Sequence, residues 1–294
     1  MAACQRIGDM LCEVGESPLW HPAEQALYWT DIPARRLWRH DPASGANHSW
    51  ALPEMAGCIA RTADGWLLAM QTGIYTLPAL QPGAPAGALA RVAGVAHAAA
   101  QMRFNDGRCD RQGRFWAGTM MMDMAAAEPV GRLYRVAQGR LAQPLADPFL
   151  TPNGMAFSPD GRIMYVSDSH PRRPPAVWAY AYDADTGTPH TPRVFIPALA
   201  SGRPDGAAVD ADGCYWICGN DAGQVHRYTP AGKLDRSIAL PAAKPAMCAF
   251  GGPDLATLYV TSIRPAHSAA DALDGAVFAL RPGVQGLEEP AYAG

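Results

Sequence analysis

The apolar residues of the chain fall into short, strand-like pieces separated by turns. Pieces rich in Trp, Tyr, Val and Leu each follow a Gly, an Asp or another polar turn residue; they are ALYWTDI, WLLAM, RFWAGT, IMYVSDS, CYWICGN and TLYVTS. Aromatic and β-branched residues bounded by turn formers are typical of β-strands. No long stretch shows the 3.6-residue spacing of a helix, because prolines and glycines interrupt the alanine-rich residues 79–100. The pattern therefore predicts an all-β protein.

These pieces also repeat along the chain. Each unit runs from a small or polar residue through a short apolar strand and a turn into an aromatic-rich strand, and a second pair of strands follows. Six units fit, and their starts lie 41 to 52 residues apart, at Glu16, Gly57, Asn105, Asn153, Asp205 and Met247. Such a period is typical of a four-stranded blade, and blades repeated around an axis form a propeller. We therefore expect a six-bladed β-propeller.

A propeller also has to close its ring. The alternating segment 4–13 precedes the first unit, and we expect it to pair with the C-terminal blade, which would remove an exposed sheet edge. The proline-rich residues 168–177 are the one candidate for an interdomain linker, but inside a repeat they fit a surface loop better. The prediction is a single propeller domain that spans residues 1–294.

Composition and charge narrow the range of partners. The chain has 49% hydrophobic and 17% charged residues, a net charge of -3 and no basic run, so we expect no nucleic-acid and no membrane partner. No apolar run is long enough for a membrane span, and the N-terminus lacks a signal-peptide pattern. The seven cysteines are widely spread without a Cys-x-x-Cys pair, which favours free thiols in a reducing cytoplasm.

Polar side chains stand at four of the six repeat starts. They are Glu16, Asn105 with its neighbour Asp106, Asn153 and Asp205. Asn-Gly and Asp-Gly pairs often do no more than form tight turns, and for any one of them that is the simpler interpretation. Each of repeats three to five, however, has its own hairpin turn some residues later. Because innermost strands begin at the central channel, these early residues would meet there.

Carboxylates that gather at a channel mouth indicate a cation. Two carboxylates and an amide offer only oxygen ligands, which hard divalent ions such as Ca²⁺, Mg²⁺ and Mn²⁺ prefer. The eight histidines are scattered and none adjoins these positions, which disfavours a histidine-rich zinc site. Three protein ligands would leave open positions for water or substrate.

Long motifs through the whole chain resemble one known family. The stretches GESPLW, RFNDGRCDRQGRFWAGTM, TPNGMAFSPDG, PDGAAVDADGCYW, CAFGG, LYVTS and the terminal YAG are similar, in content and order, to those of the regucalcin (senescence marker protein) and gluconolactonase family. The resemblance implies a six-bladed propeller with one divalent metal ion in the channel that hydrolyses sugar lactones. Calcium, manganese, zinc and magnesium all stay open as the identity of that ion.

The resemblance also implies roles for single residues. By motif, Glu16, Asn153 and Asp205 correspond to metal ligands, and Asp205 also to the catalytic base. The substrate-binding groups implied are Arg103, Asn105 and Asp123. The alternative for Asp205 is a ligand that only orients water.

Two other classes of protein are weighed against a lactonase. A non-catalytic calcium-binding or ligand-binding propeller would have the same blades and would bind metal without turnover. An esterase with a serine nucleophile is disfavoured, because the chain has no Gly-x-Ser-x-Gly motif. The expected partner is a small-molecule sugar lactone, and the expected state is a monomer or weak homo-oligomer in the cytoplasm.

Overall fold

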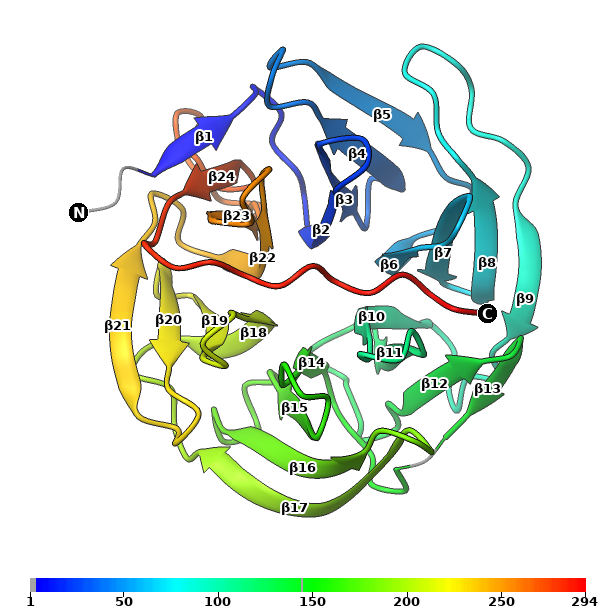
Figure 1. Cartoon of the computed structure of the whole chain (residues 1–294), viewed down its shortest axis with the longest axis vertical. Coiled ribbons are helices and arrows are strands. Elements are labelled where there is room, and N and C mark those ends of the chain that lie inside the picture. Colours follow the sequence, from blue (N-terminus) through cyan, green and yellow to red (C-terminus); the bar gives the residue numbers. More distant parts are fainter. Residues whose placement is uncertain (1–3, 144) are drawn as a thin grey trace.

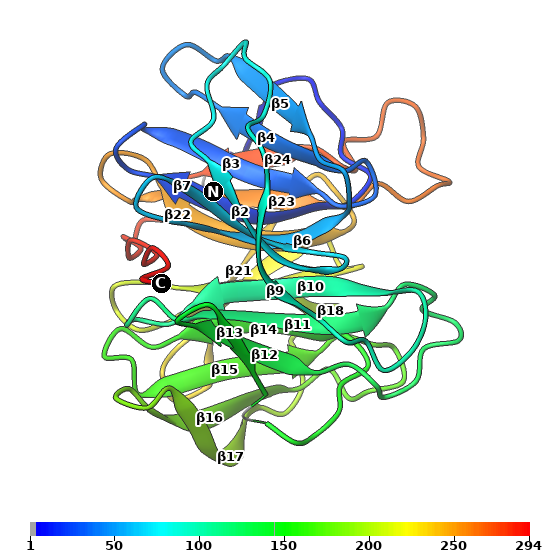
Figure 2. The ribbon, with the colours of Figure 1, turned by 90° about the vertical axis from the view of Figure 1, so that its right-hand side faces the viewer.

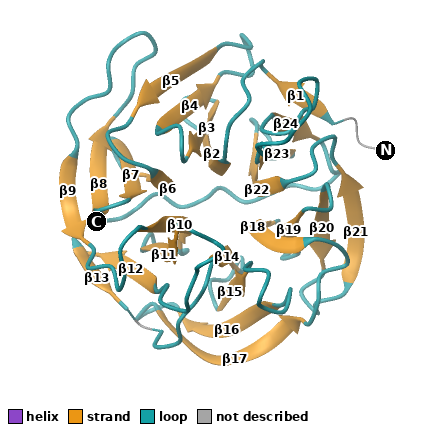
Figure 3. Ribbon diagram, turned by 180° about the vertical axis from the view of Figure 1, so that it is seen from behind, coloured by secondary structure: helices purple, strands orange, loops and turns teal. Residues whose placement is uncertain are grey.

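Six small antiparallel sheets make up the regular structure of the protein. The computed structural model describes residues 4–143 and 145–294, and all of its regular elements are strands. The sheets stand as blades around a central axis (Figure 1), and the ring seen from behind shows strands and loops without a helix (Figure 3). The predicted six-bladed β-propeller is confirmed. Among the described residues, no helix is long and apolar enough to cross a membrane.

Blades 1 to 3 come first in the chain, and each is named here from the axis outward. Blade 1 holds β2 (Gly15–His21), β3 (Ala26–Asp31), β4 (Arg36–His40) and β5 (Asn47–Ala51). Blade 2 holds β6 (Ala56–Arg61), β7 (Gly65–Met70), β8 (Gly73–Pro78) and β9 (Ala90–Gly94). Blade 3 holds β10 (Met102–Cys109), β11 (Phe115–Met121), β12 (Leu133–Ala137) and β13 (Arg140–Ala142).

Blades 4 to 6 continue the ring in the same way. Blade 4 holds β14 (Pro152–Phe157), β15 (Ile163–Asp168), β16 (Val177–Asp183) and β17 (Thr188–Ile196). Blade 5 holds β18 (Arg203–Val209), β19 (Tyr215–Asn220), β20 (Gln224–Tyr228) and β21 (Leu234–Ala239). Blade 6 holds β22 (Pro245–Gly251), β23 (Thr257–Ser262), β24 (Val277–Leu280) and, at the rim, β1 (Gln5–Ile7).

Each pair of neighbouring blades has its own hydrophobic core. There are six buried clusters, and each joins side chains of two adjacent blades. Strand β19 shows how one strand serves two cores: Trp216 and Cys218 face blade 6, whereas Tyr215 and Ile217 face blade 4. Because side chains alternate along a strand, an inner strand buried on both faces becomes almost continuously apolar. This explains why pieces such as CYWICGN contain so few polar residues.

The ring closes where the two ends of the chain meet. Strand β1 pairs antiparallel with β24, with Gln5 opposite Ala279 and Ile7 opposite Val277. The predicted pairing of segment 4–13 with the last blade is confirmed. Of the proline-rich stretch 168–177, residues 169–176 connect β15 to β16 within blade 4 and form a loop, as expected. All seven cysteines are free, also as expected.

The C-terminal segment after β24 crosses the middle of the ring. Figure 1 shows it in red running over the inner strands, and Figure 2 shows it on one side of the ring. Its backbone is tied down by bonds from the amide of Tyr292 to the carbonyl of Arg61 (2.7 Å) and from that of Ala293 to Gly113 (3.0 Å). Glu289 of this segment pairs with Arg108 of blade 3. The segment therefore covers the face where the hairpin turn of β10 and β11 lies.

Candidate active site

A β-bulge interrupts every innermost strand near its start. The pairing register shifts between Glu16 and Leu19, and between the equivalent residues of the other five blades. In blade 5 the bulge holds Asp205 and Gly206, which lie between the paired residues Pro204 and Ala207. A bulge bends its strand and re-aims its side chains. The early Asp-Gly and Asn-Gly pairs are therefore not hairpin turns, because the strand continues through them.

The bulges surround a cavity at the axis. Its volume is about 200 Å³. Its polar lining includes Glu16, Arg103, Asn105, Thr151, Asn153, Ser169, Arg203, Asp205 and Asn220. Its apolar lining includes Val14, Met120, Met122, Met124 and Ile263. Five of the six predicted site residues thus line one space, although they come from four blades.

Asn153 lies in this cavity with one side-chain atom unpaired. Its amide nitrogen donates to the hydroxyl of Ser169 at 2.9 Å, which fixes the orientation of the amide group. Its Oδ1 is buried and has no hydrogen-bond partner among the described residues. A buried carbonyl oxygen without a donor is costly, so this atom points to a ligand that the protein itself does not supply.

The two carboxylates are held in a similar way. The Asp205 Oδ2 atom accepts a 2.6 Å hydrogen bond from the side chain of Asn220, and the Glu16 Oε2 atom accepts one of 3.3 Å from the amide of Ser17. Asp205 Oδ1 and Glu16 Oε1 have no hydrogen bond within residues 4–143 and 145–294. Together with Asn153 Oδ1, three oxygen atoms from three blades are thus left without a donor from the described residues.

Burial and like charge disfavour ionisation of both acids. Each side chain is only 6% exposed. Burial raises the pKa of Glu16 well above its usual value, and the charges of Asp205 and Asp106 raise it further. Burial likewise raises the pKa of Asp205 to about 7, against the lowering effects of Arg203 and Asn220. A cation placed between these acids would stabilise their charged forms.

Arg103 and Asn105 form a connected pair at the cavity wall. The Arg103 guanidinium donates to Asn105 Oδ1 and to the carbonyl of Phe104, both at 2.8 Å. The Asn105 amide nitrogen donates to the carbonyl of Pro152 in the next blade at 3.1 Å. Asn105 thus has its acceptor and one donor engaged, and it orients Arg103. Burial lowers the pKa of Arg103, while Glu16 and Asp205 raise it.

Two other residues considered from the sequence lie apart from the cavity lining. Asp106 is buried, and its Oδ2 accepts a 2.8 Å bond from the amide of Met155, so it braces blade 3 against blade 4. Asp123 is exposed, and its Oδ1 accepts from the amides of Ala125 and Ala126 in the turn that it begins. The structure does not place Asp123 among the residues that line the cavity.

The donor set fits a hard cation better than a zinc ion. Among the described residues there is no group of three His, Cys, Asp or Glu side chains arranged to hold a metal. The three oxygen donors at the cavity are two carboxylates and the amide of Asn153. Carboxylate and amide oxygens are ligands that Ca²⁺, Mg²⁺ and Mn²⁺ accept. The three unpaired oxygens therefore fit such an ion.

Sequence reasoning missed several residues of the site. Asn220, Ser169 and Arg203 line the cavity, and the first two position Asp205 and Asn153. Asn220 pairs directly with Arg203 across the hairpin. The sequence does carry a sign of such residues: a polar residue, such as the Asn at the end of CYWICGN, closes an aromatic strand. Hairpin pairing places that residue beside the start of the preceding strand, where the site residues lie.

Comparison with known proteins gives consistent matches over nearly the whole chain. A family model described as SMP-30/Gluconolactonase/LRE-like region matches residues 14–264. A 6-deoxy-6-sulfogluconolactonase from Pseudomonas putida is 43% identical over 289 residues, which cover 96% of this chain and 95% of that protein. A pentonolactonase from Haloferax volcanii is 34% identical over 264 residues, covering 87% of this chain and 84% of that protein.

The solved structures show the same likeness. The crystal structure of a calcium-binding protein, regucalcin, from Agrobacterium tumefaciens matches with a TM-score of 0.89 and 31% sequence identity. The match covers 99% of this chain and 97% of that one. Fold and sequence therefore agree along the full length.

Proposed function

The chain belongs to the SMP-30/gluconolactonase/LRE-like family, and from that premise we propose that it hydrolyses a sugar lactone to the corresponding sugar acid in the channel cavity. This membership confirms the resemblance noted in the sequence motifs. The observation that carries the proposal is a set of three side-chain oxygens, from Glu16, Asn153 and Asp205, that have no hydrogen-bond donor among the described residues; of these, the Asn153 oxygen is buried. They lie beside two arginines in a cavity of about 200 Å³.

One divalent cation belongs to the proposed machinery. Glu16 and Asn153 would hold it through the oxygens that the protein leaves unpaired, and Asp205 through its carboxylate group. When bound, such an ion polarises a carbonyl oxygen and offsets the charge of the two carboxylates. The relative from Agrobacterium tumefaciens is named as a calcium-binding protein, which agrees with a hard cation in this chain.

Asp205 is proposed as the base. Asn220 fixes its Oδ2 by a 2.6 Å hydrogen bond, so its Oδ1 is the oxygen available to a water molecule in the cavity. As that water adds to the lactone carbonyl, Oδ1 takes its proton. The proton then passes to the ring oxygen when the carbon–oxygen bond of the ring breaks. A positioned carboxylate of this kind contributes about 10²- to 10⁴-fold.

The remaining polar residues would bind the sugar. Arg103 donates to hydroxyl oxygens from a position that Asn105 fixes. Met120, Met122 and Met124 present flexible apolar surface at the cavity wall. Asp123 stays a predicted substrate contact; reaching the sugar would require movement of the turn that it begins.

The test is a panel of sugar lactones followed by acid release, with and without a chelator. We expect turnover above spontaneous hydrolysis, lost in chelator and restored by Ca²⁺, Mg²⁺ or Mn²⁺, while circular dichroism shows an unchanged fold. Full activity of a metal-free sample would contradict the cation. Tight cation binding without turnover on any lactone would instead support a non-catalytic calcium-binding propeller.

The charges at the cavity favour a lactone that bears an anionic group. Arg203 donates to the Asp221 carboxylate at 2.6 Å, and Lys244 pairs with the same carboxylate. Two positively charged side chains therefore share one carboxylate at the edge of the cavity. The relative from Pseudomonas putida is named for a sulfonated gluconolactone. We therefore propose a sugar lactone with an anionic substituent as the preferred substrate.

The two lysines of the chain provide a matched test. Lys244→Gln should lower the ratio of kcat/KM for 6-deoxy-6-sulfogluconolactone to kcat/KM for gluconolactone about fivefold, because one positive charge is lost. Lys233→Gln, which changes the same charge in the exposed turn before β21, should leave that ratio unchanged. Equal kcat/KM values of the native protein for both lactones would contradict this substrate class without affecting the lactonase assignment.

A further inference from the structure

A second cavity lies between blades 3 and 4, away from the channel. Its volume is about 380 Å³, within the range of small-molecule sites. It shares no lining residue with the channel cavity. The reason for the opening is the outer strand of blade 3: β13 has three residues, whereas β17 of blade 4 has nine. The rim of blade 4 therefore extends past its neighbour and leaves one face uncovered.

That face carries aromatic side chains in an unusual state of exposure. Trp178, Tyr180 and Tyr182 alternate along β16 and so point to the same side. Tyr182 is buried and bonded to Asp110, whereas Trp178 is 40% exposed. The other seven tryptophans of the chain are buried or half-buried. Val194, opposite Trp178 on β17, is 45% exposed, which extends the apolar patch. Trp178 and Val194 are therefore the exposed apolar side chains of this face.

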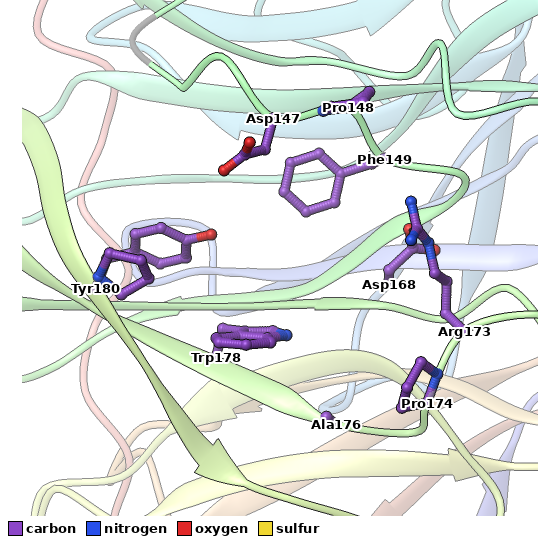
Figure 4. Close-up of a pocket in the computed structure, with 10 residues that line it drawn as sticks. Asp147, Pro148, Phe149, Asp168, Arg173, Pro174, Ala176, Trp178 and Tyr180 are labelled. Atoms are coloured by element: carbon purple, nitrogen blue, oxygen red, sulfur yellow. The ribbon is translucent and has the colours of Figure 1, made fainter.

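The rings leave a space between them. Figure 4 shows Phe149, Trp178 and Tyr180 around one opening, with Asp147 on the side of Tyr180 and Arg173 on the other side. None of these three rings packs against another aromatic ring of the described chain. The Tyr180 hydroxyl and the Trp178 indole nitrogen have no hydrogen-bond partner among the described residues. Trp178 thus offers an exposed ring face, while the buried rings of Phe149 and Tyr180 form the wall of the opening.

The charges at this cavity leave one carboxylate uncompensated. Asp168 accepts bonds from the amides of Leu150 (2.8 Å) and Thr151 (2.9 Å) and lies 3.4 Å from Arg173. Arg173 and Asp168 therefore neutralise each other. Asp147 has no ion-pair or hydrogen-bond partner in the described part of the chain. It lies near Tyr180, whose pKa is raised by burial and further by the Asp147 charge.

The lining favours a cation that also has apolar surface. Aromatic faces attract ammonium groups, and a nearby carboxylate adds direct charge attraction. Pro148, Pro174 and Pro192 add apolar surface to the lining, which suits alkyl groups. An anion would be repelled by Asp147. We propose that the cleft between blades 3 and 4 binds a small organic cation, a protonated or quaternary alkylamine, with Asp147 as its counter-ion and Trp178 and Tyr180 covering its alkyl groups.

Choline and its uncharged isostere 3,3-dimethylbutan-1-ol test the proposal on the full chain. Each is titrated by calorimetry and followed through the indole N–H resonance of Trp178. We expect saturable choline binding in the millimolar range or tighter, and at least about tenfold weaker binding of the isostere. Trp178→Ala and Asp147→Asn should each weaken choline binding about fivefold or more. Lactone hydrolysis, which uses the other cavity, should not change in either variant.

A matched control lies at the end of the same hairpin. Asp185→Asn removes an exposed carboxylate from the turn between β16 and β17 and should leave choline binding unchanged. Absence of saturable choline binding, equal binding of choline and its isostere, or choline affinity unchanged in Trp178→Ala and Asp147→Asn would each overturn the proposal. Saturation of the cleft by glucose or gluconate rather than choline would also overturn it, in favour of a sugar site.

Discussion

Asp205 shows how a buried cavity residue can oppose the stability of its own fold. It is 6% exposed, close enough to the acids Glu16 and Asp106 to interact with them, and held by a hydrogen bond from Asn220. Burying a carboxylate beside others of its kind costs free energy unless a cation compensates. The fold tolerates this arrangement because six interblade cores stabilise the ring around it.

The first prediction concerns the stability of the metal-free protein. The pKa of Asp205 is about 7 in the fold and about 3.9 in an unfolded chain. Between these values the folded protein binds more protons than the unfolded one, so the free energy of unfolding falls as pH rises. In chelator at pH 8, Asp205→Asn should therefore raise that free energy by about 1–3 kcal/mol, and the gain should shrink toward pH 5.

Asp210 of the same strand hairpin supplies the matched control. Asp210 is buried, as Asp205 is, but it accepts hydrogen bonds from Trp216 and Arg227, each at 2.8 Å. Asp210→Asn should lower the free energy of unfolding by about 3 kcal/mol, because an amide nitrogen in place of Oδ2 cannot accept from Trp216 and Arg227 in the core. Denaturant titration measures both variants. Destabilisation by Asp205→Asn in chelator would show that the carboxylate is not under electrostatic strain.

The site residues that could be predicted from the sequence are those that stand at equivalent positions of the repeat. Glu16, Asn153 and Asp205 occupy equivalent repeat positions, so their meeting in the channel followed from the fold alone. Asn220 and Ser169 lie at the ends of second strands and act through neighbouring side chains, which requires the hairpin register. The open cleft at Trp178 depends on the lengths of two outer strands, and the weak pattern of residues 140–142 gave no sign of a strand.

At the scale of elements, the bulge is the device that turns strand residues toward the axis. All six inner strands carry one, including those of blades 2 and 6, where no charged residue needs to be placed. The bulge is therefore part of the repeated architecture, and blades 1, 4 and 5 use it to place Glu16, Asn153 and Asp205 at the cavity. A glycine next to the functional residue allows the neighbouring blade to approach closely.

The second prediction tests that close approach at Gly206. A Cβ atom there would lie 2.4 Å from Cβ and Cγ of Met247 and 2.7 Å from its Cα. Because the backbone of blade 6 would have to move, Gly206→Ala should lower the free energy of unfolding by about 1–3 kcal/mol. It should also reduce kcat at least tenfold by displacing Asp205.

Gly87→Ala is the control, since a Cβ there would lie 3.1 Å from the Pro78 side chain in a surface loop. It should change the free energy of unfolding by less than about 0.5 kcal/mol. Chemical denaturation and lactone turnover measure both effects. A Gly206→Ala protein with native stability and kcat would contradict the role assigned to the bulge.

At the scale of the whole molecule, Arg108 connects elements that are distant in sequence. It belongs to blade 3, donates to the carbonyls of Met155 in blade 4 and Ala207 in blade 5, and pairs with Glu289 of the C-terminal segment. Ring closure by β1 was predictable from the alternating pattern of segment 4–13. The path of the C-terminal segment was not, because its residues follow no strand or helix pattern and are held by these specific contacts.

The third prediction compares two adjacent glutamates of that segment. Glu289 is 11% exposed and pairs with Arg108, which is 5% exposed, whereas Glu288 is 52% exposed and contacts Arg61 at 2.7 Å. Glu289→Gln should lower the free energy of unfolding by about 3 kcal/mol, since a buried arginine loses its charge partner. Glu288→Gln should cost less than about 1 kcal/mol. Equal effects in thermal or chemical denaturation would show that the segment does not brace the ring.

The most direct test of the proposed function is the rate of lactone hydrolysis by Asp205→Asn at a saturating concentration of divalent cation. The substitution keeps the shape of the side chain and one ligand oxygen but removes the base. With the native protein as reference, and spontaneous hydrolysis subtracted, kcat should fall on the order of 10²- to 10⁴-fold. Near-normal kcat together with normal cation affinity would contradict the account, because Asp205 would then be neither base nor ligand.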